Sequence, residues 1–96
     1  MSASPPAKMR LAVAPNVHAR EFDGELILLH LEDGEYFALN EVGARVWTEL
    51  AAGRSLQEIA NALRPDYDVD PQSLMEDCVS LVDELLKRHL VVQRGP

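Results

Sequence analysis

The stretch that decides the fold runs from Gly34 to Trp47 and reads GEYFALNEVGARVW. Residues Tyr36 to Leu39 are aromatic or apolar and include no proline, which favours a short strand. Asn40 follows at once, and an asparagine side chain can accept a hydrogen bond from a backbone N–H in the first turn of a helix. The stretch therefore predicts a strand that runs directly into a helix, which is an architectural join and not a catalytic motif.

The length of the chain limits it to one domain. It has 96 residues, and a chain of this size buries only about 60–65% of its unfolded surface, so a deep enclosed active site is not expected. Pro5, Pro6 and Pro15 interrupt the first segment, which predicts a flexible tail over residues 1–15 and a folded domain over residues 16–93. The apolar runs are too short to span a bilayer, so we expect a cytoplasmic protein without a membrane partner.

Charge and cysteine content exclude further classes. The formal net charge of −7 argues against a nucleic-acid partner, because binding to phosphates depends on clustered lysine and arginine. Cys78 is the only cysteine, so the chain can form no internal disulfide and no thiolate metal cluster by itself.

Two more strands are expected before the join, at residues 17–21 and 25–31, with a turn at Asp23-Gly24 between them. With the strand at 36–39 they form a three-stranded antiparallel meander. Asp33-Gly34 suits a two-residue hairpin turn, which would place Leu28 opposite Leu39.

Three helices are expected after the sheet, which gives an α+β fold. The first covers about 41–52, the second begins with the capping box SLQE at 55–58, and the third extends from the cap Asp70 to about His89. Residues 90–92 are apolar and suit a short final strand.

The third helix has an unusually wide apolar face, of roughly 160° at 100° per residue. One interpretation is that the extra width packs under the N-terminal or C-terminal residues. The other is that one part serves the core, namely Leu74, Cys78, Leu81 and Leu85. The remainder, Met75, Val79, Val82 and Leu86, would then line a groove for another chain.

No set of residues predicts catalysis. His18, His30 and His89 are far apart and have no carboxylate or thiol at ligand spacing, so no metal site is expected. Cys78 lies on the apolar side of an acidic helix and is expected to be a buried core residue, because a nucleophilic thiolate needs an exposed, electropositive setting. We expect a protein that is not an enzyme and has no cofactor.

The third strand is expected to be a free edge of the sheet if the first strand pairs with the second. Free edges are usually guarded by lysine, proline or a bulge. The residues Tyr36-Phe37-Ala38-Leu39 have none of these, which favours the addition of an extended peptide as a further strand.

Four segments of the chain resemble PqqD-like proteins: DGEYFALN at 33–40, GARVW at 43–47, GRSLQEI at 53–59 and LLKRHLV at 85–91. The resemblance extends over about 17–92. It implies a winged-helix-like fold with a three-stranded antiparallel sheet followed by three helices. It also implies that the leader segment of a precursor peptide binds as a strand between the third strand and the third helix. The expected peptide-binding residues are Glu35, Tyr36, Phe37, Ala38, Leu39, Met75, Val79, Val82, Asp83 and Leu86.

Within that family the motifs are most similar to the freestanding recognition proteins of lasso-peptide biosynthesis. This similarity implies a separate leader peptidase, and a cyclase, as partners. Related proteins of pyrroloquinoline quinone biosynthesis instead present their precursor to a radical SAM enzyme, and the sequence fits both. A small winged-helix interaction module, or a homodimer that uses the free edge and the wide third helix, are the alternatives. A DNA-binding winged helix is disfavoured because the exposed side of the third helix is acidic.

Overall fold

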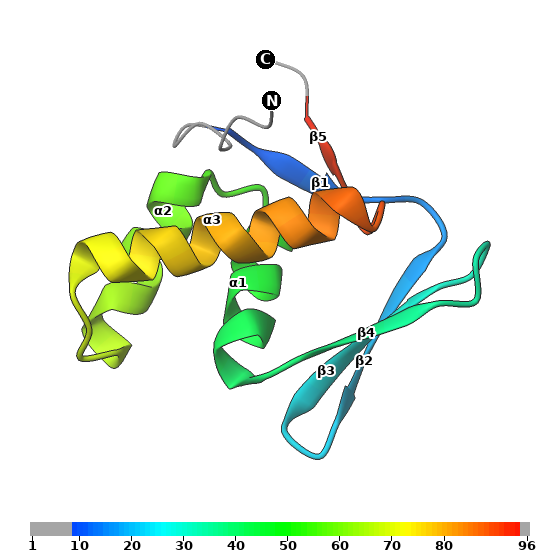
Figure 1. Ribbon diagram of the computed structural model, residues 1–96, viewed down its shortest axis with the longest axis horizontal. Helices are drawn as coiled ribbons and strands as arrows, with labels where there is room; N and C mark the ends of the chain where they lie inside the picture. The colour runs from blue at the N-terminus through cyan, green and yellow to red at the C-terminus, as the bar shows by residue number, and fades with distance from the viewer. Residues whose placement is uncertain (1–8, 95–96) are drawn as a thin grey trace.

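The computed structural model describes residues 9–94 and has an α+β fold (Figure 1). A three-stranded antiparallel sheet is followed by three helices, as the sequence predicts, and a second sheet consists of two short strands. No helix within residues 9–94 combines the length and the apolar character that crossing a bilayer requires.

The larger sheet is a meander in the order β2-β3-β4, with β2 at Val17–Phe22, β3 at Glu25–His30 and β4 at Tyr36–Leu39. The turn between β2 and β3 has the predicted two residues. Asp23 and Gly24 have φ angles of +54° and +84°, and such a turn requires positive φ at both positions.

The predicted register of β3 against β4 is wrong by two residues, because Leu26 lies opposite Leu39. The connection is a four-residue loop at 31–34, which the N–H of Gly34 closes by donating to the carbonyl of His30 at 2.8 Å. The N–H of His30 donates to the carbonyl of Glu35 at 2.9 Å. A shift by an even number of residues leaves every side chain on its predicted face of the sheet.

The three helices begin at the predicted caps. Their bounds are Glu41–Ala51 for α1, Leu56–Leu63 for α2 and Pro71–Lys87 for α3, with a 3₁₀ turn η1 at Arg64–Asp66 after α2. The side chain of Asn40 accepts a hydrogen bond from the N–H of Gly43 at 2.8 Å, and Ser55 and Glu58 form both halves of a capping box.

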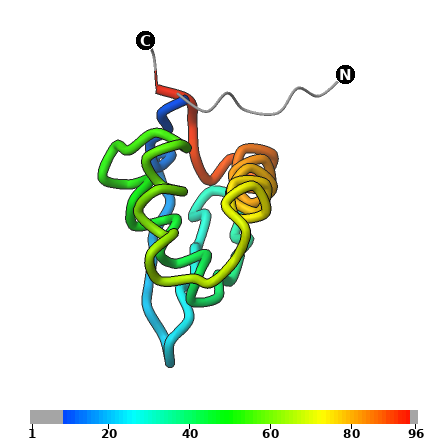
Figure 2. Tube along the Cα trace, turned by 90° about the vertical axis from the view of Figure 1, so that its left-hand side faces the viewer, coloured from blue at the N-terminus to red at the C-terminus, as the bar shows by residue number. Residues whose placement is uncertain are grey.

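The helices lie to one side of the larger sheet and enclose the core with it (Figures 1 and 2). Leu28 and Leu39 extend from the inner face of the sheet into a buried cluster with Val46, Trp47 and Leu50 of α1. The side chains that alternate with them point to the outer face, and Tyr36 there is 71% exposed.

The second sheet corrects the expectation of a tail for residues 11–13, which lie within the described part of the chain. Leu11–Val13 form β1, which pairs antiparallel with β5 at Val91–Gln93, so the predicted final strand has a partner. Leu11 is part of the core, and this burial outweighs the prolines that suggested a tail. Residues 1–8 lie outside the described part of the chain.

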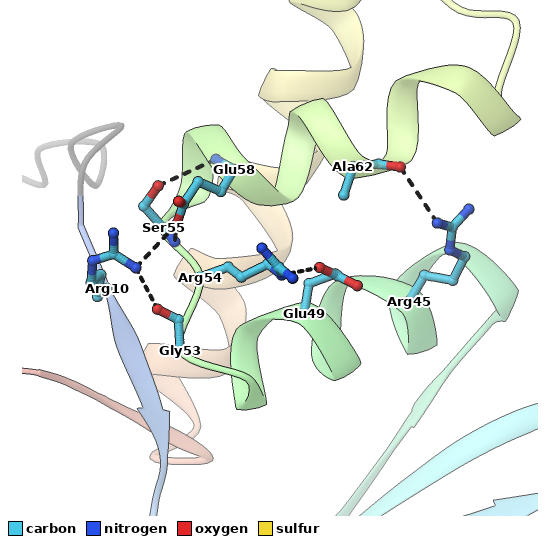
Figure 3. A network of polar contacts seen from close by, with 8 residues as sticks. All are labelled: Arg10, Arg45, Glu49, Gly53, Arg54, Ser55, Glu58 and Ala62. Atoms are coloured by element: carbon cyan, nitrogen blue, oxygen red, sulfur yellow. Dashed lines mark hydrogen bonds and ion pairs between the residues drawn. The ribbon is translucent and has the colours of Figure 1, made fainter.

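Arg10 fixes the start of β1 to the helices (Figure 3). Its guanidinium donates to the carbonyl of Gly53 at 2.6 Å and to the carboxylate of Glu58 at 3.0 Å. The N–H of Ser55 donates to the same carboxylate at 2.8 Å, and these bonds hold the pKa of Glu58 below its ordinary value. The network therefore joins β1 to the beginning of α2.

Candidate functional site

The strand β4 is an unpaired edge of the sheet within residues 9–94. None of its four residues is charged or a proline. The opposite edge, β2, contains His18, Arg20 and Glu21, and charged side chains are a common protection against strand addition. Of the two edges, β4 is thus the one that is open to another chain.

The backbone groups of β4 alternate in direction. The bond from the N–H of His30 to the carbonyl of Glu35 identifies these two residues as a hydrogen-bonded pair. Because such pairs alternate with non-bonded pairs along an antiparallel ladder, Phe37 directs its backbone groups toward β3. Tyr36 and Ala38 direct theirs outward. The edge therefore presents an N–H and a carbonyl at each of two positions, as strand addition requires.

The C-terminal end of α3 lies beside the beginning of β4. The guanidinium of Arg88 is 4.7 Å from the ring centroid of Phe37, and its Nε donates to the carboxylate of Glu84 at 3.0 Å. A small cavity of about 10 Å³ lies at this contact, with Tyr36 and Leu90 also in its wall. An extended segment added to β4 would run beside these side chains.

His30 forms the buried wall of the same cavity. It is 8% exposed, and its Nδ1 has no hydrogen-bond partner among the described residues. The nearest carboxylate oxygen, on Asp33, is 3.8 Å away. His30 thus offers an unused polar atom at the end of the edge.

Most of the predicted residues of α3 lie on a different side of the helix from Arg88, whose side chain contacts β4. The contact of Arg88 with Phe37 identifies the side of α3 that faces β4. The backbone N–H of Arg88 donates to the carbonyl of Glu84 as in a regular helix, so angles around the helix axis can be counted from Arg88. At 100° per residue, four of the predicted residues lie at least about 140° from Arg88 around the helix axis. These are Met75, Val79, Asp83 and Leu86. The three apolar ones are half-buried against the core, and α3 packs on α2 and β5, which accounts for the wide apolar face.

The predicted division of α3 is also wrong at two positions. Val82 was expected in a groove, but it is 0% exposed and belongs to the core. Leu81 was expected in the core, but it is only partly buried and lies about 20° from Arg88 around the axis. The buried stripe of α3 is therefore formed by Leu74, Cys78, Val82 and Leu85, on a helix that packs against α2.

The predicted residues of the sheet do lie together. Tyr36 and Ala38 are exposed on the outer face, Phe37 is half-buried beside Arg88, and Glu35 precedes the strand. Leu39 is 3% exposed, so its side chain belongs to the core, and only its neighbours are accessible.

Sequence analysis missed Arg88, and its ion-pair partner Glu84, as residues beside this edge. The available signal was their spacing, because residues 84 and 88 are four positions apart and share one side of a helix.

Within residues 9–94, the groups to consider for chemistry are the Cys78 thiol and any side chains that could hold a metal ion. Burial, and secondly the charge of Asp77, raise the pKa of the Cys78 thiol, which is the opposite of what a nucleophile needs. No group of three or more histidine, cysteine or acidic side chains suited to a metal ion occurs within residues 9–94.

Comparison with known proteins gives a family match over the part of the chain that contains β4 and α3. The profile of the family described as coenzyme PQQ synthesis protein D matches residues 25–91, which include β3, β4 and all three helices. A search of the curated proteins found no match.

Two solved structures are similar to the chain over nearly their whole length. One is described as TbiB1 in complex with the TbiA(beta) leader peptide. It has 30% sequence identity and a TM-score of 0.80, over 88% of this chain and 99% of that one. The other is described as lasso peptide synthetase B1 complexed with the leader peptide. It has 25% identity and a TM-score of 0.81, over 86% of this chain and 98% of that one.

Proposed function

Since the chain belongs to the PqqD family, we propose that it captures the leader segment of a ribosomally made precursor peptide and presents it to a separate leader peptidase in lasso-peptide biosynthesis. The bound leader forms a fourth strand on β4. A cyclase acts later on the same precursor.

The observation that carries this proposal is the open edge of β4 beside α3. Tyr36 and Ala38 direct unpaired backbone groups outward, and an added strand can satisfy them with the hydrogen bonds of an antiparallel or parallel ladder. Phe37 and Arg88 stand beside the same edge and give the peptide side chains an aromatic and a cationic neighbour. Both similar structures are described as complexes with a leader peptide, which supports this use of the fold.

The protein acts in this scheme without chemistry of its own. Purified protein incubated with a leader-containing precursor should leave the peptide intact, as followed by mass spectrometry. Cleavage in a preparation without peptidase would contradict this part of the proposal.

A second candidate is the presentation of a precursor to a radical SAM enzyme, which the description of the matching family favours. The similar structure described as lasso peptide synthetase B1 favours the lasso-peptide pathway instead. The neighbouring open reading frames discriminate between the two pathways. A peptidase and an asparagine-synthetase-like cyclase fit the first pathway, and a radical SAM enzyme fits the second.

Amide hydrogen exchange tests the site directly. Addition of the precursor encoded beside the gene should slow exchange at the N–H groups of Tyr36 and Ala38. Ala19 is the internal control, because it lies in a non-bonded pair of the other edge strand and its N–H also points outward. Protection at Ala19, with none at Ala38, would place the peptide on the wrong edge for this proposal.

A further inference from the structure

The outer face of the larger sheet has a cavity of its own, away from the helices and with a volume of about 560 Å³. Its apolar wall consists of Phe22, Ile27, Leu29, Leu31 and Tyr36. Phe22 is 70% exposed and Leu31 is 53% exposed. Contiguous exposed apolar side chains of this kind mark interaction sites on soluble proteins, and aromatic residues are common among the residues that dominate binding.

The strand register explains why these residues gather there. On the outer face, Leu29 lies between His18 of β2 and Tyr36 of β4, and Ile27 lies opposite Arg20. The helices cover only the inner face, so this layer has no cover within residues 9–94.

The charge of the cavity differs in sign from the charge of the chain. Arg20 is the cationic side chain in its wall, His18 is the other basic side chain there, and no carboxylate lines it, although the chain has 16 acidic residues and a net charge of −7. Glu25 shares the outer face, opposite Phe22 at the turn, but it does not line the cavity. Arg20 has no ion-pair partner among the described residues.

We infer that this outer face is a docking site for an acidic, apolar segment of a second protein, whose apolar side chains enter the cavity while a carboxylate pairs with Arg20. The inference goes beyond the proposed capture of the leader and does not depend on it.

A second copy of this chain fits the surface less well. A symmetric dimer that joins the same cavity on both subunits would bring Arg20 of the two copies together across an apolar wall that has no carboxylate. An anionic membrane also fits less well, because a chain of charge −7 is repelled by such a surface, and because the site is concave.

The docking site and the β4 edge use different groups. The cavity is formed by side chains, whereas strand addition uses the outward backbone groups of Tyr36 and Ala38. Tyr36 contributes its side chain to the first and its backbone to the second. Both sites can therefore be occupied at once.

A matched pair of synthetic peptides tests the inference. The first is an amphipathic helical peptide with leucine and phenylalanine on one side and glutamate beside them. The second has every glutamate replaced by lysine. We expect the acidic peptide to bind the wild-type protein at least about tenfold more tightly than the lysine peptide. In NMR spectra of the labelled protein, the shifts should map to Phe22, Leu29 and Tyr36.

Two variants test the contributions of charge and of apolar contact to peptide binding. Arg20→Glu should invert the preference between the two peptides, because the charge at the rim changes sign. Phe22→Ser should lower the affinity for the acidic peptide by at least about tenfold. The melting temperature should stay close to that of the wild type, since the side chain of Phe22 is largely exposed. Val69→Ser is the control, because Val69 is also exposed but lies in the loop before α3.

Several results would overturn the inference. Equal binding of both peptides by wild type would remove the role of Arg20, and shifts confined to β4 and α3 would assign the peptides to the leader site. Sedimentation that shows a dimer, dissociated by Phe22→Ser, would make a second copy the occupant. Binding to anionic phosphatidylserine vesicles that Arg20→Glu abolishes would assign the face to a membrane.

Discussion

The guanidinium of Arg88 lies over the ring of Phe37, 4.7 Å from its centroid, and this contact joins the end of α3 to β4. Glu84 orients the guanidinium from one turn earlier in the helix at 3.0 Å. An extended segment added to β4 would run beside this contact.

Replacement of this arginine should have a measurable effect on stability. Arg88→Ala removes an exposed cation–π contact and an ion pair, and we expect it to lower the free energy of unfolding by about 0.5–1 kcal/mol in urea titration. Lys87→Ala is the control, because Lys87 forms only an exposed ion pair with Asp83. A larger loss from Lys87→Ala would show that the contact with Phe37 contributes nothing.

Val82 should respond as a core residue. Val82→Glu places a carboxylate at a position that is 0% exposed, which costs several kcal/mol and should unfold a domain of this size. Ser80→Glu, on the exposed side of the same helix, should leave the melting curve by circular dichroism close to that of the wild type. Cooperative melting of Val82→Glu at the wild-type temperature would show that Val82 faces a groove after all.

The capping network should make stability depend on pH. The N–H of Ser55, and then Arg10, hold the pKa of Glu58 below its ordinary value of 4.5. A depressed carboxyl pKa in the folded state stabilises the fold above pH 4.5, and this contribution is lost as the pH falls through the lower folded value. The gap in urea midpoint between wild type and Glu58→Gln should therefore be larger at pH 7 than at pH 3. Glu76→Gln is the control, because Glu76 forms no ion pair among the described residues, and its difference in urea midpoint from the wild type should be the same at both pH values. The same difference for Glu58→Gln at pH 7 and at pH 3 would contradict the linkage.

The thiol of Cys78 should be unreactive in the folded protein. It is 2% exposed, and burial raises its pKa, so both access and thiolate formation are suppressed. Iodoacetamide labelling, followed by mass spectrometry, should be slow in buffer at pH 7 and fast in concentrated urea. Rapid labelling of the folded protein would argue for an exposed, activated cysteine.

Local signals in the sequence predicted most of the fold. Asn40, Ser55 and Asp70 all cap helices in the structure, because a capping side chain acts on backbone groups within three residues of itself. The positive φ of Asp23 and Gly24 likewise depends on only those two residues.

Features that depend on distant contacts were predicted less well. The register of β4 was wrong because Asp33-Gly34 also fits a longer loop, and the sequence does not choose between the two. The strand β1 was missed because its partner, β5, lies at the other end of the chain. For α3, the helical period gave the width of the apolar face, but only the packing of α2 decides which part of it is buried.

The measurement that tests the central claim most directly is the affinity of the leader peptide for Ala38→Pro. Ala38 lies in a non-bonded pair with Ile27, so its N–H points away from β3, and edge strands tolerate proline in that orientation. The added strand would lose one backbone hydrogen bond and meet the proline ring. Ala19→Pro is the matched control, since Ala19 is an exposed alanine in a non-bonded pair of the other edge strand, β2.

Both variants should keep the circular dichroism spectrum and most of the thermal stability of the wild type. In a fluorescence-polarisation titration with a labelled leader peptide, Ala38→Pro should bind at least about tenfold more weakly, or about 1.4 kcal/mol, while Ala19→Pro binds as the wild type does. Unchanged affinity in a folded Ala38→Pro protein would contradict strand addition at β4.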